Sequence, residues 1–564
     1  MSKEWRTSPD HENTGWPKGI RYIVGNEVCE RFSYYGMRAI LTVHLVALYA
    51  LSGQTEQEAS DSATAAYHLF AGAVYAFPMI GAILADRYWG KYKTILWLSL
   101  MYCVGHGVLA VADIPEDPDL RLNLVFLGLG CIAVGAGGIK PCVSANVGDQ
   151  FGRKNWFRVQ TVYQVFYFSI NFGSFFATLL IPWIRGDGTE LWRTSLAFGI
   201  PGILMAIATF FFWLGRHEFV HVPPRPGGKL GLMDTVAGAV MFMAIGHLFV
   251  TPAEWGWLVR IGMSVGFLVL GLMLFFSRQR TAPDDGFLAI FLYDLKVKLG
   301  GSREAPVEGH DAEAAEDSPL RKPSLWARFW EPAIERYGMA ATEGPYAVFK
   351  ICTIFIFIPI FWAIFDQHGS TWILQAQSMD THMFGVEVRP EQVAAANPLM
   401  VMALIPLMNL VYKGSAKLGF EWTPLRRMVI GIAVAGASFA VAAVAQHRID
   451  AQGDGVVSIW WQVLAYLILT TSEVLVSITA LEFAYTQAPK RMKSVVMGLF
   501  MLTITLGNLF VSLLTAAKDG MASLLGGEFG QAEFFWFFCW TAVIVSVLMA
   551  VRAKFYVRRD YTQD

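Results

Sequence analysis

Apolar windows of about 20 residues recur along the whole chain, and they restrict its fold more than any other feature. A window of this length crosses the hydrocarbon core of a bilayer as an α-helix, whose backbone polar groups are satisfied internally. The sequence therefore predicts an all-α polytopic membrane protein with 14 transmembrane helices in groups of six, two and six. The expected spans are 21–50, 65–85, 93–112, 121–145, 158–183, 194–214, 231–250, 257–277, 349–373, 395–412, 427–445, 459–486, 494–517 and 534–556.

The grouping of these windows predicts three parts. We expect a six-helix bundle over residues 1–215, two inserted helices with a linker over 216–348, and a second six-helix bundle over 349–564. Only 16% of the 564 residues are charged, against about 25% in soluble domains, so a large soluble domain is not expected. The net charge of −1 argues against a nucleic-acid partner.

The distribution of Lys and Arg predicts the orientation. With both termini in the cytoplasm, the loops on the opposite side hold only Arg121, Arg185, Arg193, Arg389, Arg448 and Lys518. Cytoplasmic loops carry an excess of basic residues, so we expect a multi-pass protein with both termini in the cytoplasm. The six cysteines all lie in apolar segments, which indicates buried apolar residues. We expect neither a disulfide framework nor a metal site.

The first span carries four full charges: Glu27, Glu30, Arg31 and Arg38. Even on lenient scales an ionisable residue at bilayer depth costs about 2.5–3.5 kcal/mol. At about 100° per residue, Glu27, Arg31, Tyr34 and Arg38 form one stripe with Glu30 beside it. The stripe must therefore face a polar cavity or ion-pair partners. A purely structural ion pair is the alternative.

The two halves differ in the charges that lie within their expected spans. The first half supplies the cations Arg31, Arg38 and Lys140, whereas the second half supplies the carboxylates Asp366, Glu473 and Glu482. Opposite charges on two bundles can form ion pairs that break and form again. The chain contains no phosphate-loop pattern, but residues 217–221 match HExxH and residues 262–266 match GxSxG. The first lies between two expected spans and the second inside one, away from the helix and the strand–turn–helix settings in which these patterns act, so we do not expect an enzyme or direct use of ATP.

Residues 81–93, between the second and third spans, read GAILADRYWGKYK. They resemble the short-loop signature of the major facilitator superfamily, with one extra residue before Gly90. The glycines permit close helix approach. Asp86 can cap a helix terminus or pair with a loop cation, so we expect it to control conformation rather than to bind substrate. An ordinary cytoplasmic turn is the alternative.

Five longer motifs narrow the resemblance. The motifs are E27xxERFxYYG at the first helix, G135xGGIKP at the fourth, F166YxxINxGS at the fifth, F361WAxFDQxGS at the seventh and E473xxxS with E482FxYxxAP at the tenth. With these motifs the chain resembles the bacterial proton-dependent oligopeptide transporters of that superfamily. This resemblance implies the major facilitator fold, two six-helix bundles plus two inserted helices, in the bacterial cytoplasmic (inner) membrane.

The resemblance also implies a substrate and a site. A short peptide is a zwitterion, so its site needs a fixed cation near one end and a fixed anion near the other. Arg31, Arg38 and Lys140 are the expected partners of the peptide carboxylate. Glu473 is the expected partner of the ammonium, helped by the amides of Asn171 and Asn397. The remaining expected pocket residues are Tyr34, Tyr35, Tyr75, Tyr167, Trp362, Ser477 and Phe500, the last standing where many relatives have tryptophan.

Proton coupling requires a group whose protonation changes with substrate or conformation. Glu27 and Glu30 compete for Arg31, so a peptide carboxylate that engages Arg31 would free them to take up protons. His68, in the family-matched sequence Tyr67-His68, is a second candidate. We expect it to act with an Arg38–Asp366 pair at an outer gate, and packing is the alternative.

The resulting hypothesis is import of di- and tripeptides by proton symport, with alternating access. Lys140 and Glu473 are expected to pair across the two halves when the inner side closes. No cofactor is expected beyond the proton gradient, and partners are peptides, protons and membrane lipid, with a functional monomer. The alternatives are a same-fold transporter of another solute such as nitrate, a channel, or a peptide sensor.

Overall fold

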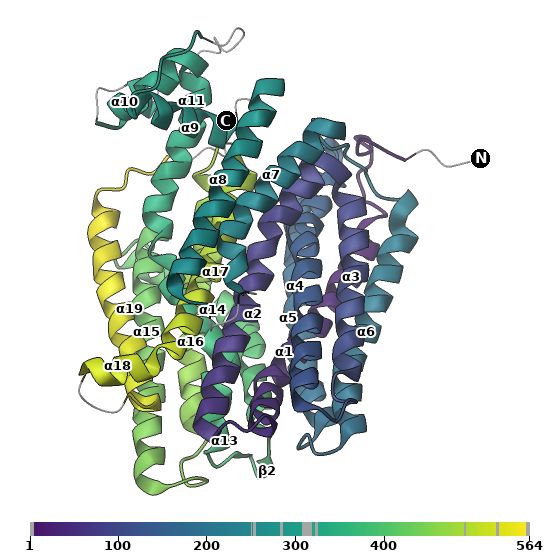
Figure 1. Ribbon diagram of the computed structural model, residues 1–564, viewed down its shortest axis with the longest axis vertical. Coiled ribbons are helices and arrows are strands. Elements are labelled where there is room, and N and C mark those ends of the chain that lie inside the picture. Colours follow the sequence, from purple (N-terminus) through teal and green to yellow (C-terminus); the bar gives the residue numbers. More distant parts are fainter. Residues whose placement is uncertain are drawn as a thin grey trace.

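The computed structural model is a bundle of long helices that cross the molecule from end to end (Figure 1). It describes residues 5–249, 251, 255–282, 286–306, 318–321, 325–489, 492–525 and 529–559. Both marked ends of the chain lie at the end of the bundle that also carries α9, α10 and the start of α11 (Figure 1). We call it the terminal end, and we call the other end, where α13 lies, the distal end.

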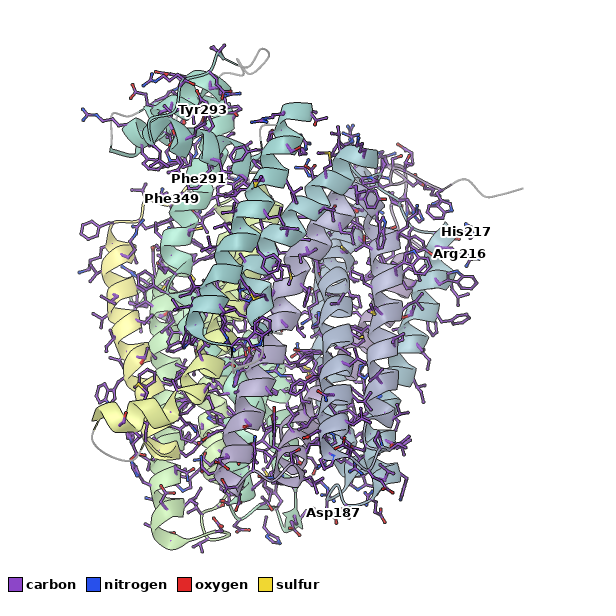
Figure 2. The ribbon with its side chains drawn as sticks, in the orientation of Figure 1. Asp187, Arg216, His217, Phe291, Tyr293 and Phe349 are labelled. Atoms are coloured by element: carbon purple, nitrogen blue, oxygen red, sulfur yellow. The ribbon has the colours of Figure 1, made fainter. Side chains whose placement is uncertain are left out.

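The first half contains six long helices joined by short turns. They are α1 Ile20–Leu51, α2 Glu56–Leu84, α3 Lys91–Val111, α4 Pro118–Asp149, α5 Val159–Arg185 and α6 Leu191–Leu214, with the short turns η1 Ala85–Trp89, η2 Arg153–Arg158 and η3 Gly215–His217. Asp187, after α5, lies at the distal end, whereas Arg216 and His217, after α6, lie toward the terminal end (Figure 2).

The second half follows an inserted region. The inserted elements are α7 Gly228–Gly246, η4 His247–Phe249, α8 Trp257–Thr281, α9 Phe287–Lys298, η5 Pro319–Arg321 and α10 Leu325–Phe329. The second half comprises α11 Glu331–Phe355, α12 Ile358–Phe365, η6 Asp366–Gly369, α13 Thr371–Gln377, η7 Pro390–Ala395, α14 Ala396–Lys417, α15 Pro424–Gln452, α16 Trp460–Thr486, α17 Lys493–Ala516, α18 Lys518–Leu525 and α19 Gln531–Lys554. A hairpin follows α13, and its two antiparallel strands have two residues each: β1 His382–Met383 and β2 Val386–Glu387.

Thirteen of the described helices are long and apolar enough to cross a membrane, and a bent pair brings the number to 14 when it counts as one span. The predicted six-two-six arrangement is therefore confirmed. The span predicted over 349–373 differs in detail, because α11 contains a break at Gly338 (φ 77°) and the chain bends by 48° between Phe355 and Ile358. Pro359 in the first turn of α12 explains the bend, since proline has no N–H for a continuing helix.

Each half has its own hydrophobic core. One cluster of buried side chains runs from Ile20 to Phe219 and the other from Val348 to Tyr556. A smaller cluster at the terminal end joins α9 to α11 around Trp330, and Tyr293 and Phe291 mark its position in Figure 2. The two large cores give each half an independent interior, so the halves can move as bodies.

The glycines of the fourth-helix motif allow α4 to approach its neighbours closely. A Cβ on Gly137 would lie 2.5 Å from the Phe77 Cβ of α2, and one on Gly138 would lie 2.1 Å from Leu98 Cδ1 of α3. Gly81 of α2 faces the same contact, since its Cβ would lie 2.2 Å from the Gly137 carbonyl oxygen. Helices in a bilayer gain packing energy where small residues let backbones approach.

The inserted helix α7 packs directly on the 81–93 loop. Asp234 of α7 accepts from Arg278 Nε of α8 at 2.6 Å and lies 3.6 Å from Arg87 Nη1. The Arg87 carbonyl oxygen accepts from the backbone N–H of Gly227 at 3.1 Å. Close backbone approach requires glycine at position 231, because a Cβ there would lie 1.8 Å from the Arg87 oxygen.

A Gly231→Ala variant is therefore expected to destabilise the protein. The added methyl group meets a backbone oxygen that a rotamer change cannot move, and overpacking of this kind costs about 1–3 kcal/mol. The midpoint of thermal unfolding in detergent measures the effect. Gly266→Ala in α8 is the matched control, since a Cβ at Gly266 has no heavy atom within 4 Å. Equal midpoints for the two variants would contradict the close contact at Gly231.

Candidate functional site

The charged stripe of α1 forms a compact ion cluster. Arg31 Nε donates to Glu27 Oε1 at 2.7 Å and lies 3.2 Å from Glu30 Oε2. Both glutamate side chains are almost fully buried, while 15% of the Arg31 side chain is exposed. The predicted competition of two acids for one cation is present. The exposed part of Arg31 leaves its guanidinium accessible to another anion.

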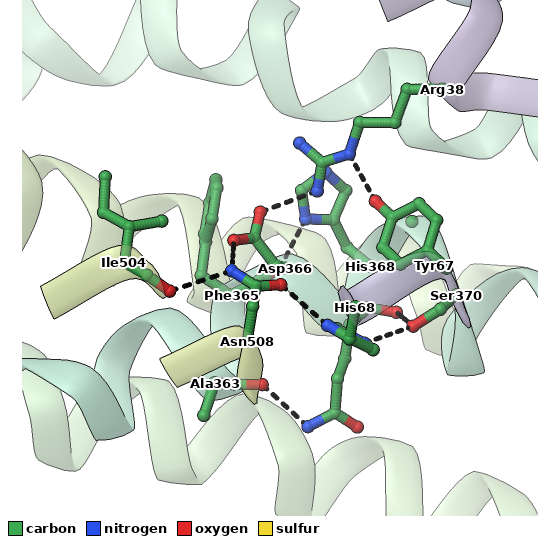
Figure 3. Close-up of polar contacts among 12 residues, drawn as sticks. Arg38, Tyr67, His68, Ala363, Phe365, Asp366, His368, Ser370, Ile504 and Asn508 are labelled. Atoms are coloured by element: carbon green, nitrogen blue, oxygen red, sulfur yellow. Dashed lines mark hydrogen bonds and ion pairs between the residues drawn. The ribbon is translucent and has the colours of Figure 1, made fainter. Parts of the chain in front are cut away.

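Two turns further along α1, Arg38 joins the two halves. Its Nη2 lies 2.6 Å from Asp366 Oδ1 of η6, and its Nε donates to the Tyr67 hydroxyl of α2. Figure 3 shows this pair at the centre of a buried polar network. Arg38 is 6% and Asp366 2% exposed, so removing one partner would leave a buried charge. The predicted Arg38–Asp366 pair is confirmed.

His68 of α2 belongs to the same network. Its Nδ1 is 2.8 Å from Asn508 Oδ1 of α17, and its Nε2 is 2.8 Å from the Ser370 hydroxyl. Asn508 Nδ2 in turn donates to Asp366 Oδ2 at 2.7 Å (Figure 3). The histidine is thus coupled to the Arg38–Asp366 pair through one amide. Its assigned role in proton coupling stays a prediction.

Asn508 and Ser370 are site residues that our sequence reasoning missed. Asn508 is fully buried and lies between His68 and Asp366. An amide in the middle of an apolar span is itself a signal, because a polar group in hydrocarbon needs a partner. Ser370 lies inside the seventh-helix motif, but the motif does not predict which histidine its hydroxyl contacts.

Among the described residues, Lys140 of α4 has no ion-pair partner in this conformation. Its Nζ lies 4.4 Å from the ring centroid of Tyr34 and 3.9 Å from that of Tyr75, and within the described chain it makes no hydrogen bond. Cation–π contacts of this kind hold an ammonium without neutralising it. The predicted Lys140–Glu473 pair is not formed here and stays a prediction for another conformation.

Glu473 of α16 is held on the other half by an amide. Its Oε2 accepts from Asn397 Nδ2 of α14 at 2.7 Å, and the same amide donates to the Thr470 hydroxyl at 3.1 Å. Asn397 is thus beside Glu473 as expected. Asn171, by contrast, donates to the Tyr167 carbonyl oxygen of its own helix at 3.0 Å, so the structure does not join its amide to Glu473.

Aromatic residues connect the cations of one half with the carboxylate of the other. Tyr35 lies within electrostatic reach of Arg31 and of Glu473, and Tyr167 within reach of Glu473. Tyr167 is 37% exposed although its helix lies in the bundle. Tyr35 therefore lies near a cation of the first half, and both tyrosines lie near the carboxylate of the second half.

Phe500 and Trp362 form a second aromatic contact. Their ring centroids are 6.2 Å apart at 75°, an edge-to-face geometry. Trp362 Nε1 is buried without a hydrogen-bond partner among the described residues. Ser477 lies one turn from Glu473 on α16 and is half-buried. Phe500 thus stands beside Trp362 with a ring but no donor, as expected from the sequence.

Asp86 lies at a distance from these residues, in the single π-helical turn η1 at the terminal end. Its neighbours in electrostatic reach are Lys91, Asp149 and Arg87, and Lys91 Nζ is 2.6 Å from Asp149 Oδ2. The backbone oxygen of Asp86 accepts from Arg225 N–H at 2.8 Å. These contacts tie Asp86 to the loops rather than to the central site.

Three ion pairs connect the halves toward the distal end. Besides Arg38–Asp366, Lys518 pairs with Asp61 of α2, and Arg185 Nη1 at the end of α5 lies 3.7 Å from Glu391 Oε1 of η7. Hydrogen bonds add to them, such as Thr42 Oγ1 to the Gly369 carbonyl oxygen at 2.7 Å. The two halves are therefore in contact at the distal end.

Comparison with known proteins agrees with this architecture. A family model described as the POT family matches residues 92–276 and 339–527. The mouse protein solute carrier family 15 member 2 is 33% identical over 453 residues, which cover 79% of this chain and 51% of the mouse protein. The chain spans about half the length of the curated relatives it matches.

Solved structures match over nearly the whole chain. An auto-inhibited POT family peptide transporter is 35% identical with a TM-score of 0.75, covering 97% of this chain and 99% of that one. The POT family transporter PepTSo is 36% identical with a TM-score of 0.73, covering 96% and 99%.

The two helical bundles, together with these matches, define a polytopic membrane protein and agree with the prediction that the chain is not an enzyme. The chain belongs to the POT family.

Proposed function

We propose that the chain is a proton-coupled symporter that imports di- and tripeptides by alternating access around the central site. The observation that supports it best is the placement of Arg31 and Lys140 on one half and Glu473 on the other, with Tyr35 in reach of both Arg31 and Glu473. A peptide zwitterion matches this pair of opposite fixed charges. A simple anion such as nitrate would leave Glu473 without a cation.

The proposal includes a membrane and a driving force. The protein lies in the bacterial cytoplasmic membrane with both termini in the cytoplasm, so the distal end faces outward and this conformation is closed to the exterior. The proton gradient is the only energy source, no cofactor takes part, and a monomer surrounded by lipid is sufficient. The Arg38–Asp366 and Lys518–Asp61 pairs would break when the outer side opens.

The arrangement predicts a defined orientation of the peptide. Glu473→Gln is expected to weaken binding of a dipeptide with a free amino terminus by at least about tenfold, since a charge-assisted hydrogen bond contributes about 1.5–3 kcal/mol. Binding of the N-acetylated dipeptide, already weak in the wild type, is expected to change less than twofold. Affinities measured by calorimetry on purified protein check both.

The control is Glu482→Gln, because Glu482 is half exposed and lies 3.9 Å from Arg427 at the other side of α16. Unchanged affinity for the free dipeptide in Glu473→Gln would remove Glu473 as the ammonium partner. An equal loss for both peptides would point to a general distortion of the pocket and would also contradict this orientation.

A further inference from the structure

A second group of polar residues lies behind the ion cluster, in the interior of the first half. Ser33 Oγ of α1 is 2.8 Å from His106 Nε2 of α3. Further polar side chains extend from this contact along both helices. We name the whole group the α1–α3 polar seam, and it consists of Asn26, Glu30 and Ser33 on α1 with Ser99, Tyr102 and His106 on α3.

Helix geometry places the seam residues in two stripes. Residues four and seven positions apart lie on one face of a helix, as do 26, 30 and 33 on α1 and 99, 102 and 106 on α3. Both helices run from the terminal toward the distal end, so both stripes extend about 10 Å back from the Ser33–His106 bond. Tyr102 is in electrostatic reach of Glu30 and lies beside Ser33, which agrees with this register.

The seam is completely buried and poorly satisfied. All six side chains have a relative exposure of 0%. Among the described residues, no hydrogen-bond partner exists for either amide atom of Asn26 or for the Ser99 hydroxyl. The Tyr102 hydroxyl and His106 Nδ1 have only poorly aligned partners, the Ser33 side chain and the Phe198 backbone. The Glu30 oxygens likewise accept no hydrogen bond from the part of the chain that the structure describes, and Glu30 Oε2 lies 3.2 Å from Arg31 Nε. Such groups are normally paired with protein or ordered water.

The surroundings show that the position of His106 is specific. A Cβ on Gly202 of α6 would lie 2.8 Å from the His106 Cβ, so only glycine leaves room for the imidazole there. Phe198 of α6 lies next to the ring through its backbone, and it has no titratable side chain. The groups that face Glu30 are Glu27 and Arg31 on α1, Tyr102 on α3 and Lys140 on α4.

We infer that the α1–α3 polar seam is an internal water site through which Glu30 exchanges its proton with His106. Buried waters make about three hydrogen bonds each to otherwise unsatisfied polar groups, and the seam offers several such groups within two helical turns. Chains of carboxylate, hydroxyl, water and histidine are the usual proton relays inside membranes. His106 is thus a second proton site behind the ion cluster.

The proton step conserves charge within the seam. A proton that leaves the Glu30 carboxyl passes to a water or to the Ser33 hydroxyl, which releases its own proton to His106. The products are a Glu30 carboxylate and an imidazolium, and the reverse step restores the two neutral groups. The carboxylate then pairs with Arg31, which lies 3.2 Å away. This inference rests on the proposed proton symport, because it gives Glu30 a proton donor that does not cross the peptide site.

His106→Gln and Ser33→Ala test the relay in proteoliposomes. Both variants are expected to move the pH of half-maximal dipeptide uptake in the same direction by about one unit, which corresponds to one pKa unit at the coupled group. Dipeptide affinity at acidic pH is expected to stay within twofold. His44→Gln is the matched control, because His44 is a buried histidine of the same bundle next to Asp113 rather than Glu30. Its pH profile is expected to remain that of the wild type.

A second readout does not depend on transport. The infrared band of the protonated Glu30 carboxyl, assigned by its loss in Glu30→Gln, is expected to shift in His106→Gln and to stay in place in His44→Gln. An unchanged band and an unchanged pH profile in folded His106→Gln would overturn the inference. If that variant does not fold, Ser33→Ala decides by the same two measurements. Wild-type protein without proton-dependent uptake would contradict the proposed function instead, and the infrared shift would still test the seam.

Discussion

The double variant Glu27→Gln, Glu30→Gln is expected to lose accumulation of dipeptide against a gradient while it still exchanges labelled for unlabelled dipeptide. Both carboxylates are buried against one guanidinium, so the two glutamates compete for a single cation. A peptide carboxylate at Arg31 changes this balance. Amides of the same shape keep the packing but carry no exchangeable acidic proton.

We expect the loss of gradient-driven accumulation to be at least about 100-fold, because coupling, rather than binding, is removed; this corresponds to about 2.8 kcal/mol. The measurement compares uptake driven by an imposed proton gradient with counterflow in the same proteoliposomes. Glu482→Gln, at a half-exposed glutamate, is expected to behave as the wild type. Full accumulation by the double variant would contradict a coupling role for the two glutamates.

Asp366→Asn is expected to loosen the contact of the two halves at the distal end. Asp366 is bound by Arg38 at 2.6 Å and by Asn508 at 2.7 Å, and an amide cannot balance the buried guanidinium. Removing one partner of a buried pair costs about 3–5 kcal/mol, which is about 100-fold or more in the population of the closed state. The state with the distal end open should therefore gain population.

Hydrogen exchange of the backbone amides in α13, Thr371–Gln377, measures this opening in the purified protein. We expect at least about tenfold faster exchange in Asp366→Asn, which is about 1.4 kcal/mol. Asp380→Asn is the matched control, since Asp380 forms an exposed pair with His382 in the adjoining loop, and exposed pairs contribute about 0–1 kcal/mol. Equal exchange in the two variants would show that the Arg38–Asp366 pair does not hold this end closed.

Sequence reasoning succeeded where a feature depends on the residues of a single helix, or where a buried charge requires a partner. Span length predicts the helices, and the stripe containing Glu27 and Arg31 follows from helical periodicity alone. The Arg38–Asp366 pair was predicted from the resemblance to the oligopeptide transporters, and it agrees with the high cost of an uncompensated charge at membrane depth. The spans and the stripe are local constraints that hold in every conformation.

Partners that depend on the relative positions of helices could not be predicted. Nothing in the sequence near Asn508 says that its amide lies between His68 and Asp366, since these residues come from three distant segments. Lys140 was expected against Glu473 but lies over two tyrosine rings, because a pairing between moving halves is a property of one conformation. The inserted helices gave no signal of their contact with Arg87, which depends on the missing side chain of Gly231.

The most direct test of the central claim is uptake of a labelled dipeptide into liposomes that contain the purified protein. The account predicts accumulation only when an inward proton gradient or a negative-inside potential is imposed. Tripeptides are expected to compete, whereas free amino acids and nitrate are not. Gradient-independent equilibration, or no uptake of any short peptide by folded protein, would contradict proton-coupled peptide import.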